Sequence, residues 1–312
     1  MNREREGLLL CLLSAAGFAA MPIFARQAYA TGIELTPLLA LRFVMAAAML
    51  WALVLLRRRP LGPPRGVALG AALGFGGYAV QAGLYFAAIQ RIDVGLASLL
   101  LYAYPSFVTL AAFALRRESP TRRKLGALAL ASSGVILVLA GGGTGSIDPL
   151  GAAMALACAG FYTVFILGSE RASAKVAAVP FAASVATGAA VTFAIAALFT
   201  GGVHASGEGV FWAAVIALIS TVIPIVLFTA GLARVGASTT AIASAIEPAL
   251  TVALAWLVLG ETLGPLQLAG GALVLSAVVL LQLRRRATML RWRTSSRPAG
   301  WRTRVARSGS PS

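Results

Sequence analysis

The stretch Glu247-Pro-Ala-Leu-Thr-Val-Ala-Leu-Ala-Trp-Leu-Val-Leu-Gly-Glu261 decides the fold, because a second stretch in the first half of the chain repeats its design. That second stretch is Tyr104-Pro-Ser-Phe-Val-Thr-Leu-Ala-Ala-Phe-Ala-Leu-Arg-Arg-Glu118, and in both a glutamate follows the proline at the same spacing. Aligning Tyr104 with Glu247 also aligns residues on either side: Leu84 with Leu227, Arg91 with Arg234, Leu125 with Leu268 and Ser133 with Ser276. The sequence therefore predicts a tandem duplication.

The composition places the duplicated unit in a lipid bilayer. The chain of 312 residues is 59% hydrophobic and 12% charged, with a mean hydropathy of +0.86, too apolar to cover a water-facing surface. A helix needs about 20 apolar residues to cross the hydrocarbon core. Ten segments meet that template, at residues 7–25, 35–56, 66–89, 94–115, 124–142, 149–168, 178–200, 209–230, 236–258 and 263–283.

Basic residues then predict the orientation. With the N-terminus in the cytoplasm, 23 of the 26 Lys and Arg residues fall in cytoplasmic links or the C-terminal tail. Five spans per unit is an odd number, so the second copy is inverted relative to the first. We therefore predict an all-α membrane protein of ten helices in two inverted repeats, residues 1–142 and 149–283, with both termini cytoplasmic. Residues 284–312 form a basic tail that we expect to be disordered.

The segments from Leu84 through Tyr104-Pro105 to Glu118, and from Val226 through Glu247-Pro248 to Glu261, resemble the EamA-type repeat of the drug/metabolite transporter superfamily. The resemblance covers roughly residues 7 to 283. It implies a secondary transporter of small metabolites or amino acids, often an exporter, that works by alternating access. It leaves the substrate open, and a nucleotide-sugar or sugar-phosphate carrier of the same fold is the main alternative.

The sequence gives less support to an enzyme, an ATP-driven transporter or a scaffold. The sequence contains no G-x-S-x-G turn, no H-E-x-x-H motif, and one histidine, so we do not expect an enzyme. It has no G-x-x-x-x-G-K-[ST] loop either, so transport is expected to use an ion gradient, exchange or facilitated flow. We expect no cofactor and no metal site, and a membrane scaffold remains a weaker alternative.

Glu247 is the sharpest candidate for a functional residue. It is the one carboxylate that lies away from the end of a predicted span, and a charge there costs about 2.5–3.5 kcal/mol on insertion scales. Pro248 cannot donate a backbone hydrogen bond, so the helix is expected to break one turn earlier and free the carbonyl of Ala243 or Ser244. Pro105 is the matching helix break in the first repeat. The alternative is that Glu247 makes a structural ion pair or a hydrogen bond between helices.

Arg42 is the other internal charge. It is a candidate to hold a substrate carboxylate or phosphate, or to neutralise Glu247, although it could instead extend to the membrane interface. Further candidate substrate-binding residues lie in helices three, four and nine: Tyr78, Gln81, Tyr85, Tyr102, Tyr104 and Ser244. Tyr78, Gln81 and Tyr85 are spaced to share one helix face. Helix packing is the plainer explanation for any single tyrosine.

Several features indicate partners and surroundings. The nine arginines of the tail, with Trp292 and Trp301, predict attraction to anionic lipid, and a binding arm for a soluble protein is the alternative. The glycine ladder Gly66, Gly70 and Gly74 predicts close helix packing, within the chain or in a homodimer. The net charge of +16 is explained by cytoplasmic loops, so no nucleic-acid partner is expected. Expected partners are a small-molecule substrate and lipids, and the expected location is a bacterial inner membrane.

Overall fold

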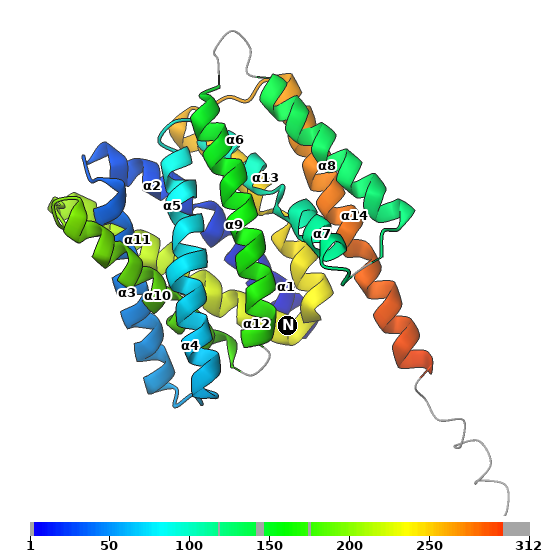
Figure 1. Ribbon diagram of the computed structural model, residues 1–312, viewed down its shortest axis with the longest axis horizontal. Coiled ribbons are helices and arrows are strands. Elements are labelled where there is room, and N and C mark those ends of the chain that lie inside the picture. The colour runs from blue at the N-terminus through cyan, green and yellow to red at the C-terminus, as the bar shows by residue number, and fades with distance from the viewer. Residues whose placement is uncertain (1–2, 118, 142–146, 174–175, 296–312) are drawn as a thin grey trace, which may run out of the picture.

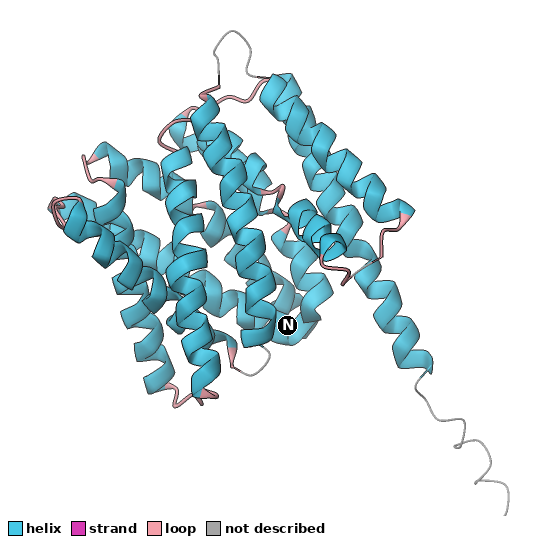
Figure 2. Ribbon diagram, in the orientation of Figure 1, coloured by secondary structure: helices cyan, strands magenta, loops and turns pink. Residues whose placement is uncertain are grey.

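The structure is a computed structural model that describes residues 3–117, 119–141, 147–173 and 176–295 (Figure 1). Within these ranges every regular element is a helix and none is a strand (Figure 2). Nine helical stretches are long and apolar enough to cross a membrane, and a tenth apolar helix, Pro265–Leu281, is shorter. The prediction of an all-helical membrane protein is confirmed at this level.

The first half contains five helical stretches that follow the predicted ranges within a few residues. Several are divided by a turn or a π-helical turn. Their elements are α1 (Arg3–Ala19) with α2 (Met21–Ala30), α3 (Leu35–Leu56), α4 (Pro64–Leu73) with the π-helical turn η1 (Gly74–Tyr78) and α5 (Ala79–Ala88), α6 (Val94–Leu101) with α7 (Tyr104–Ala114), and α8 (Arg122–Ala140).

The second half also contains five helical stretches. Its elements are α9 (Pro149–Ser173), α10 (Ala178–Phe199), α11 (Gly207–Ala217) with η2 (Leu218–Val222) and α12 (Ile223–Ser244), α13 (Glu247–Leu254) with η3 (Ala255–Leu259), and α14 (Pro265–Ser295). α12 runs through the expected eighth link and is interrupted at Gly236, whose φ of 77° and ψ of 166° are not helical. Glycine reaches this conformation without steric cost, so the chain changes direction there.

Helices of the two halves pack against each other in pairs. α1 lies along α12, α3 along α10, and α9 along α4 and α5, while α8 and α14 lie side by side at one edge of the bundle (Figure 1). Small residues allow the closest approaches. A Cβ added at Gly134 of α8 would lie 2.7 Å from the carbonyl oxygen of Gly270 in α14. Gly70 and Gly74 pack likewise against α10, so the part of the glycine ladder described there serves packing within the chain.

The last helix extends past the expected end of the tenth span. α14 continues beyond Arg284 to Ser295. Once a helix exists, each further residue adds one hydrogen bond for the one residue that it fixes, and no Pro or Gly occurs between residues 284 and 295. The disorder of the tail stays a prediction. Residues 296–312, together with Glu118, lie outside the described residues.

Candidate functional site

Glu247 lies where the predicted ninth span is broken. The chain turns at Ala245 and Ile246, α13 then begins at Glu247, and Pro248 occupies its first turn. Proline fits that position because a first-turn N–H has no helical partner. The same arrangement recurs in the fourth span, where a turn at Tyr102 and Ala103 precedes α7. Each break places a polar side chain at the start of a half-helix inside the membrane region.

Three tyrosines gather around Glu247. The side chain of Tyr102 is hydrogen-bonded to that of Glu247, and its hydroxyl also donates to the carbonyl of Ser244 at 3.4 Å. The rings of Tyr102 and Tyr104 are 5.7 Å apart between centroids, and Tyr104 lies 4.8 Å from Tyr162 of α9. These residues form what we call the Glu247 cluster, consisting of Tyr102, Tyr104, Tyr162, Ser244 and Glu247. Among the described residues, no ion pair involves Glu247.

The hydrogen bonds of this cluster depend on whether Glu247 carries a proton. A tyrosine hydroxyl carries one hydrogen, so it cannot donate to Ser244 and to an ionised Glu247 at the same time. If Glu247 is protonated, its carboxyl donates to Tyr102 and the bond from Tyr102 to Ser244 is kept. If Glu247 is ionised, it takes the hydroxyl hydrogen and the Ser244 carbonyl is released. The protonation of Glu247 therefore determines whether the Ser244 carbonyl, at the end of α12, accepts a hydrogen bond from Tyr102, at the end of α6.

The face of α5 that the sequence singled out is turned toward α9. Gln81 donates to the thiol sulfur of Cys158 at 3.3 Å, and Tyr85 is hydrogen-bonded to the side chain of Ser98. The ring of Tyr78 lies 5.1 Å from that of Phe165 in α9. Gln81 and Tyr85 are buried. Tyr78, Gln81 and Tyr85 therefore share one face, which packs between helices in this conformation.

Arg42 does not extend to the membrane interface. The residue is 1% exposed, and its guanidinium carbon lies 4.7 Å from the ring centre of Phe43 and 5.1 Å from that of Phe86. Its Nε donates to the Thr221 hydroxyl at 3.4 Å, and Tyr78 is hydrogen-bonded to the same guanidinium. The neighbours of Arg42 are thus aromatic rings and hydroxyls.

Arg42 and Glu247 are not brought together. A row of rings runs between them, from Tyr104 to Tyr162, then to Phe165 and Tyr78, with centroid separations of 4.8, 6.1 and 5.1 Å. Arg42 is hydrogen-bonded to Tyr78 at one end of this row, and Glu247 is hydrogen-bonded to Tyr102, whose ring lies 5.7 Å from that of Tyr104 at the other end. The two charges therefore lie at opposite ends of the aromatic row, and the ion pairs of the described residues do not join them.

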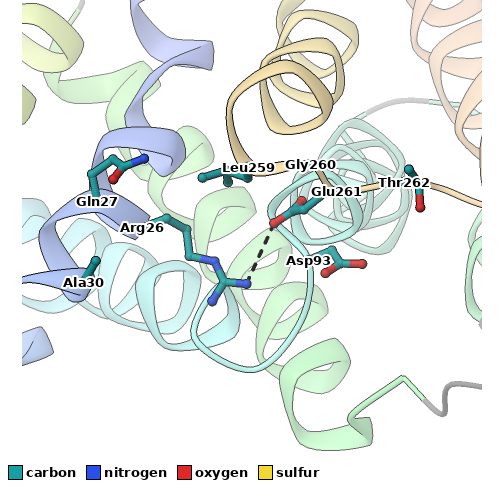
Figure 3. Close-up of a pocket in the computed structure, with 8 residues that line it drawn as sticks. All are labelled: Arg26, Gln27, Ala30, Asp93, Leu259, Gly260, Glu261 and Thr262. Carbon is teal, nitrogen blue, oxygen red and sulfur yellow. Dashed lines mark ion pairs between the residues drawn. The ribbon is translucent and has the colours of Figure 1, made fainter.

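Polar contacts also join the two halves at one end of the bundle. Glu261 follows η3 and accepts hydrogen bonds from the backbone N–H groups of Val94 at 3.0 Å and Gly95 at 3.1 Å, which caps α6. Arg26, at the end of the first span, lies 3.8 Å from the same carboxylate. Figure 3 shows Arg26 and Glu261 facing each other across a pocket of about 590 Å³, which Asp93 and Thr262 also line. Elements from both halves are joined at this end.

Three further polar residues lie apart from the Glu247 cluster. Thr229 donates back to the Val226 carbonyl at 2.9 Å, and Ser220 is fully buried. The His204 ring nitrogen lies 2.8 Å from the carbonyl of Gly201, in a link between spans. None of these three contacts the Glu247 cluster through a described hydrogen bond.

The sequence analysis missed Tyr162 and Phe165, which form the middle of the aromatic row. The signal was present, because the two residues are three apart on the sixth span and follow Cys158 on the same helix face. It also missed the capping role of Glu261. That role depends on a contact between distant segments, for which a single sequence offers no direct sign.

Apolar spans, half-helices broken inside the membrane region and a carboxylate at one break together define a membrane transporter. The chain belongs to the EamA-like transporter family, whose model matches residues 5–140 and 149–283. It is 28% identical to the uncharacterized transporter YcbK of Bacillus subtilis over 306 residues, covering 92% of this chain and 96% of that protein.

Two further likenesses concern a named exporter and a solved structure. The threonine/homoserine exporter RhtA of Escherichia coli K12 is 29% identical over 202 residues, which is 62% of this chain and 65% of RhtA. A crystal structure that is 21% identical superposes with a TM-score of 0.63, covering 90% of this chain and 98% of that one. At that identity the superposition shows a shared fold.

Proposed function

We propose that this protein is a secondary transporter, working as an exporter of small metabolites or amino acids by alternating access. Its central residue is Glu247, and the observation that carries the proposal is the Glu247 cluster at the two helix breaks. The family supports transport, and the amino-acid class is supported by the similarity to an exporter named for threonine and homoserine. An amino acid carries an ammonium group, which an intramembrane carboxylate binds well.

The helix packing supports the proposal that the two halves are inverted repeats. Exchange of the halves turns the first span into the sixth and the third into the eighth. This exchange converts the pairing of α1 with α12 into that of α9 with α4 and α5, and it maps the pairings of α3 with α10 and α8 with α14 onto themselves. Close contacts follow the same rule. Gly7 faces Arg234 and Val235, while Gly151, one residue after the counterpart of Gly7, faces the first-repeat counterparts Arg91 and Ile92.

In the pairs α3 with α10 and α8 with α14, each helix packs against its own counterpart. Alternating access follows from this arrangement if the halves rock about these two pairs. In the conformation described, Glu261 holds the start of α6, and we infer that this contact closes one end of the bundle. The charge pattern predicts that this end faces away from the cytoplasm. Reporter fusions test the orientation: those after Arg58 and Arg123 should report cytoplasm, and those near Asp148 and Glu208 should report the outside.

The proton-dependent hydrogen bonds of the Glu247 cluster supply a coupling step. An ammonium group binds Glu247 when the carboxylate is ionised, whereas a proton on Glu247 removes that charge and restores the bond from Tyr102 to Ser244. Substrate and proton therefore exclude each other at one carboxylate, which is the requirement for exchanging an outgoing substrate for an incoming proton. Tyr102 is hydrogen-bonded to this carboxylate, and no described basic side chain pairs with it.

Transport itself is tested with purified protein in liposomes loaded with a panel of radiolabelled amino acids. We expect efflux of at least one amino acid well above that of protein-free liposomes, and acceleration when the outside is acidic. The panel should include a sugar phosphate and a nucleotide sugar, because those substrates are the alternative. Efflux of only those compounds would replace the amino-acid proposal, and no efflux of any compound would argue against transport by this protein.

A further inference from the structure

Arg42 is a buried cation with no described anionic partner. The residue is 1% exposed, and the ion pairs of the described residues join other side chains. An arginine stays charged inside a protein, so it requires a compensating anion or polar environment. The rings of Phe43 and Phe86 compensate only in part, because a cation over a ring face is attracted far less strongly than by a carboxylate.

The hydrogen bonds of Arg42 are incomplete as well. A guanidinium has five N–H donors, of which Nε is used by Thr221 and another contact is made with Tyr78. Nη1 of Arg42 and Oγ of Ser220 are the two buried side-chain polar atoms without a hydrogen-bond partner in the described part of the chain. Ser220 precedes Thr221 in η2, so both unsatisfied groups belong to one neighbourhood in the bundle.

The backbone around Arg42 is shaped by two π-helical turns. Tyr78 ends η1, and Thr221, its counterpart in the second repeat, lies in η2. A π-helical turn inserts one residue into a helix and redirects the side chains that follow, a feature frequent at functional sites. Here both halves use such a turn to direct a hydroxyl to the same guanidinium.

We propose that Arg42 is the centre of an anion-binding site that accepts a small monovalent anion at Nη1, with the Ser220 hydroxyl as a second donor. One positive charge favours one negative charge, so a halide or a single carboxylate group matches the charge of this site. The anion is either free in solution or the carboxylate of the transported solute, and the second case rests on the proposed transport function. Because the aromatic row separates Arg42 from Glu247, this site is distinct from the Glu247 cluster.

Binding is tested without transport, by thermal unfolding of the purified protein in detergent micelles. Sodium gluconate is replaced stepwise by sodium chloride or by sodium acetate at constant ionic strength. We expect a saturable rise of the unfolding temperature for the wild type. Arg42→Gln should abolish the saturable part, and Ser220→Ala should weaken the apparent affinity several-fold. The matched control, Arg65→Gln, removes an exposed arginine of α4 and should respond as the wild type does.

The outcomes separate the sources of the anion. A response to both salts, with chloride reducing the effect of acetate, indicates a general anion site, and a response to acetate alone indicates a carboxylate site for the solute. If Arg42→Gln does not fold, loss of affinity in Ser220→Ala and Tyr78→Phe decides the question. No saturable response of the wild type to either salt, or an unchanged response in these variants, would overturn the proposal. Because the readout is binding, failure of transport in liposomes leaves this result standing.

Discussion

Tyr78 and Thr221 are hydrogen-bonded to the same guanidinium, that of Arg42, although they lie in different halves of the chain. Each belongs to a π-helical turn in the middle of its own span. One cation of the first half is thus held by equivalent positions of both halves. A rocking motion between the halves would have to change at least one of these two bonds, which couples the surroundings of Arg42 to the conformation of the transporter.

Removing either hydroxyl should destabilise the protein. Tyr78→Phe or Thr221→Val leaves a buried charged donor without its partner, which costs about 1–3 kcal/mol. Because both hydroxyls contact one group, the effects in the double variant should not be additive. The measurement is the unfolding free energy in mixed micelles. Thr229→Val is the control, since that hydroxyl bonds back to its own helix, and equal losses in the control would contradict a special role for Arg42.

The contact between α8 and α14 should tolerate no side chain at Gly134. A Cβ there would lie 2.7 Å from the Gly270 oxygen and 2.9 Å from the Val274 nitrogen, so the two backbones must move apart. Gly134→Ala is expected to cost about 1–3 kcal/mol of unfolding free energy. Gly126→Ala in the same helix meets nothing within 4 Å and should be neutral or stabilising. Equal stability of the two variants would show that the helices are not in close contact.

The link before α9 should show acid-dependent stability. A hydrogen bond from Arg91 and the backbone N–H of Leu150 hold the pKa of Asp148 below its usual value. Because the folded-state pKa is depressed, this contribution is present above the unfolded pKa of about 3.9 and is lost as the pH falls through the folded value.

Two variants of Asp148 separate its ion pair with Arg91 from its hydrogen bonds to the N–H groups at the start of α9. Asp148→Asn removes the charge and keeps a good capping residue, so its deficit in unfolding temperature should be visible at pH 7 and shrink toward pH 3. Asp148→Ala also loses the bonds to Leu150 and Gly151, so part of its deficit should persist in acid. A deficit in Asp148→Asn that grows on acidification would contradict the assigned sign.

Loss of the Glu261 carboxylate should open the end of the bundle that it closes. Glu261→Ala frees the N–H groups of Val94 and Gly95 and the guanidinium of Arg26. Ala97, in the first turn of α6, is fully buried. In an Ala97→Cys background, we expect labelling by a membrane-impermeant maleimide from outside to rise several-fold with Glu261→Ala. Asp93→Asn, at the same pocket, is the control, and unchanged labelling in Glu261→Ala would show that this contact does not close the end.

The fold was predictable to a large extent because the features that define a membrane span lie within a single segment of the sequence. The range 35–56 coincides with α3, and most other span ends differ by a few residues, since apolar length and charged links act within single segments. α14 extends past the predicted end of the tenth span to Ser295, in a stretch without Pro or Gly. The π-helical turns were not predicted, because they arise where packing between spans overrides the local hydrogen-bond pattern.

The candidate site was predictable in its members and less so in its geometry. Glu247 and the helix-breaking prolines stand out by charge and backbone chemistry, and Tyr102 and Tyr104 were named beside them. Their arrangement with Tyr162 depends on contact between the fourth and sixth spans. The separation of Arg42 from Glu247 follows from the same packing, so a single sequence left open whether the two charges meet.

The central claim is that the charge of Glu247 drives transport, and one measurement tests it most directly. Glu247→Gln keeps the shape and the ability to hydrogen-bond with Tyr102 but cannot ionise. Efflux from proteoliposomes is measured between pH 5 and pH 9 and normalised to folded protein by size-exclusion chromatography. We predict that Glu247→Gln folds normally and loses either transport or its dependence on pH. Transport by Glu247→Gln with the wild-type pH profile would contradict the account.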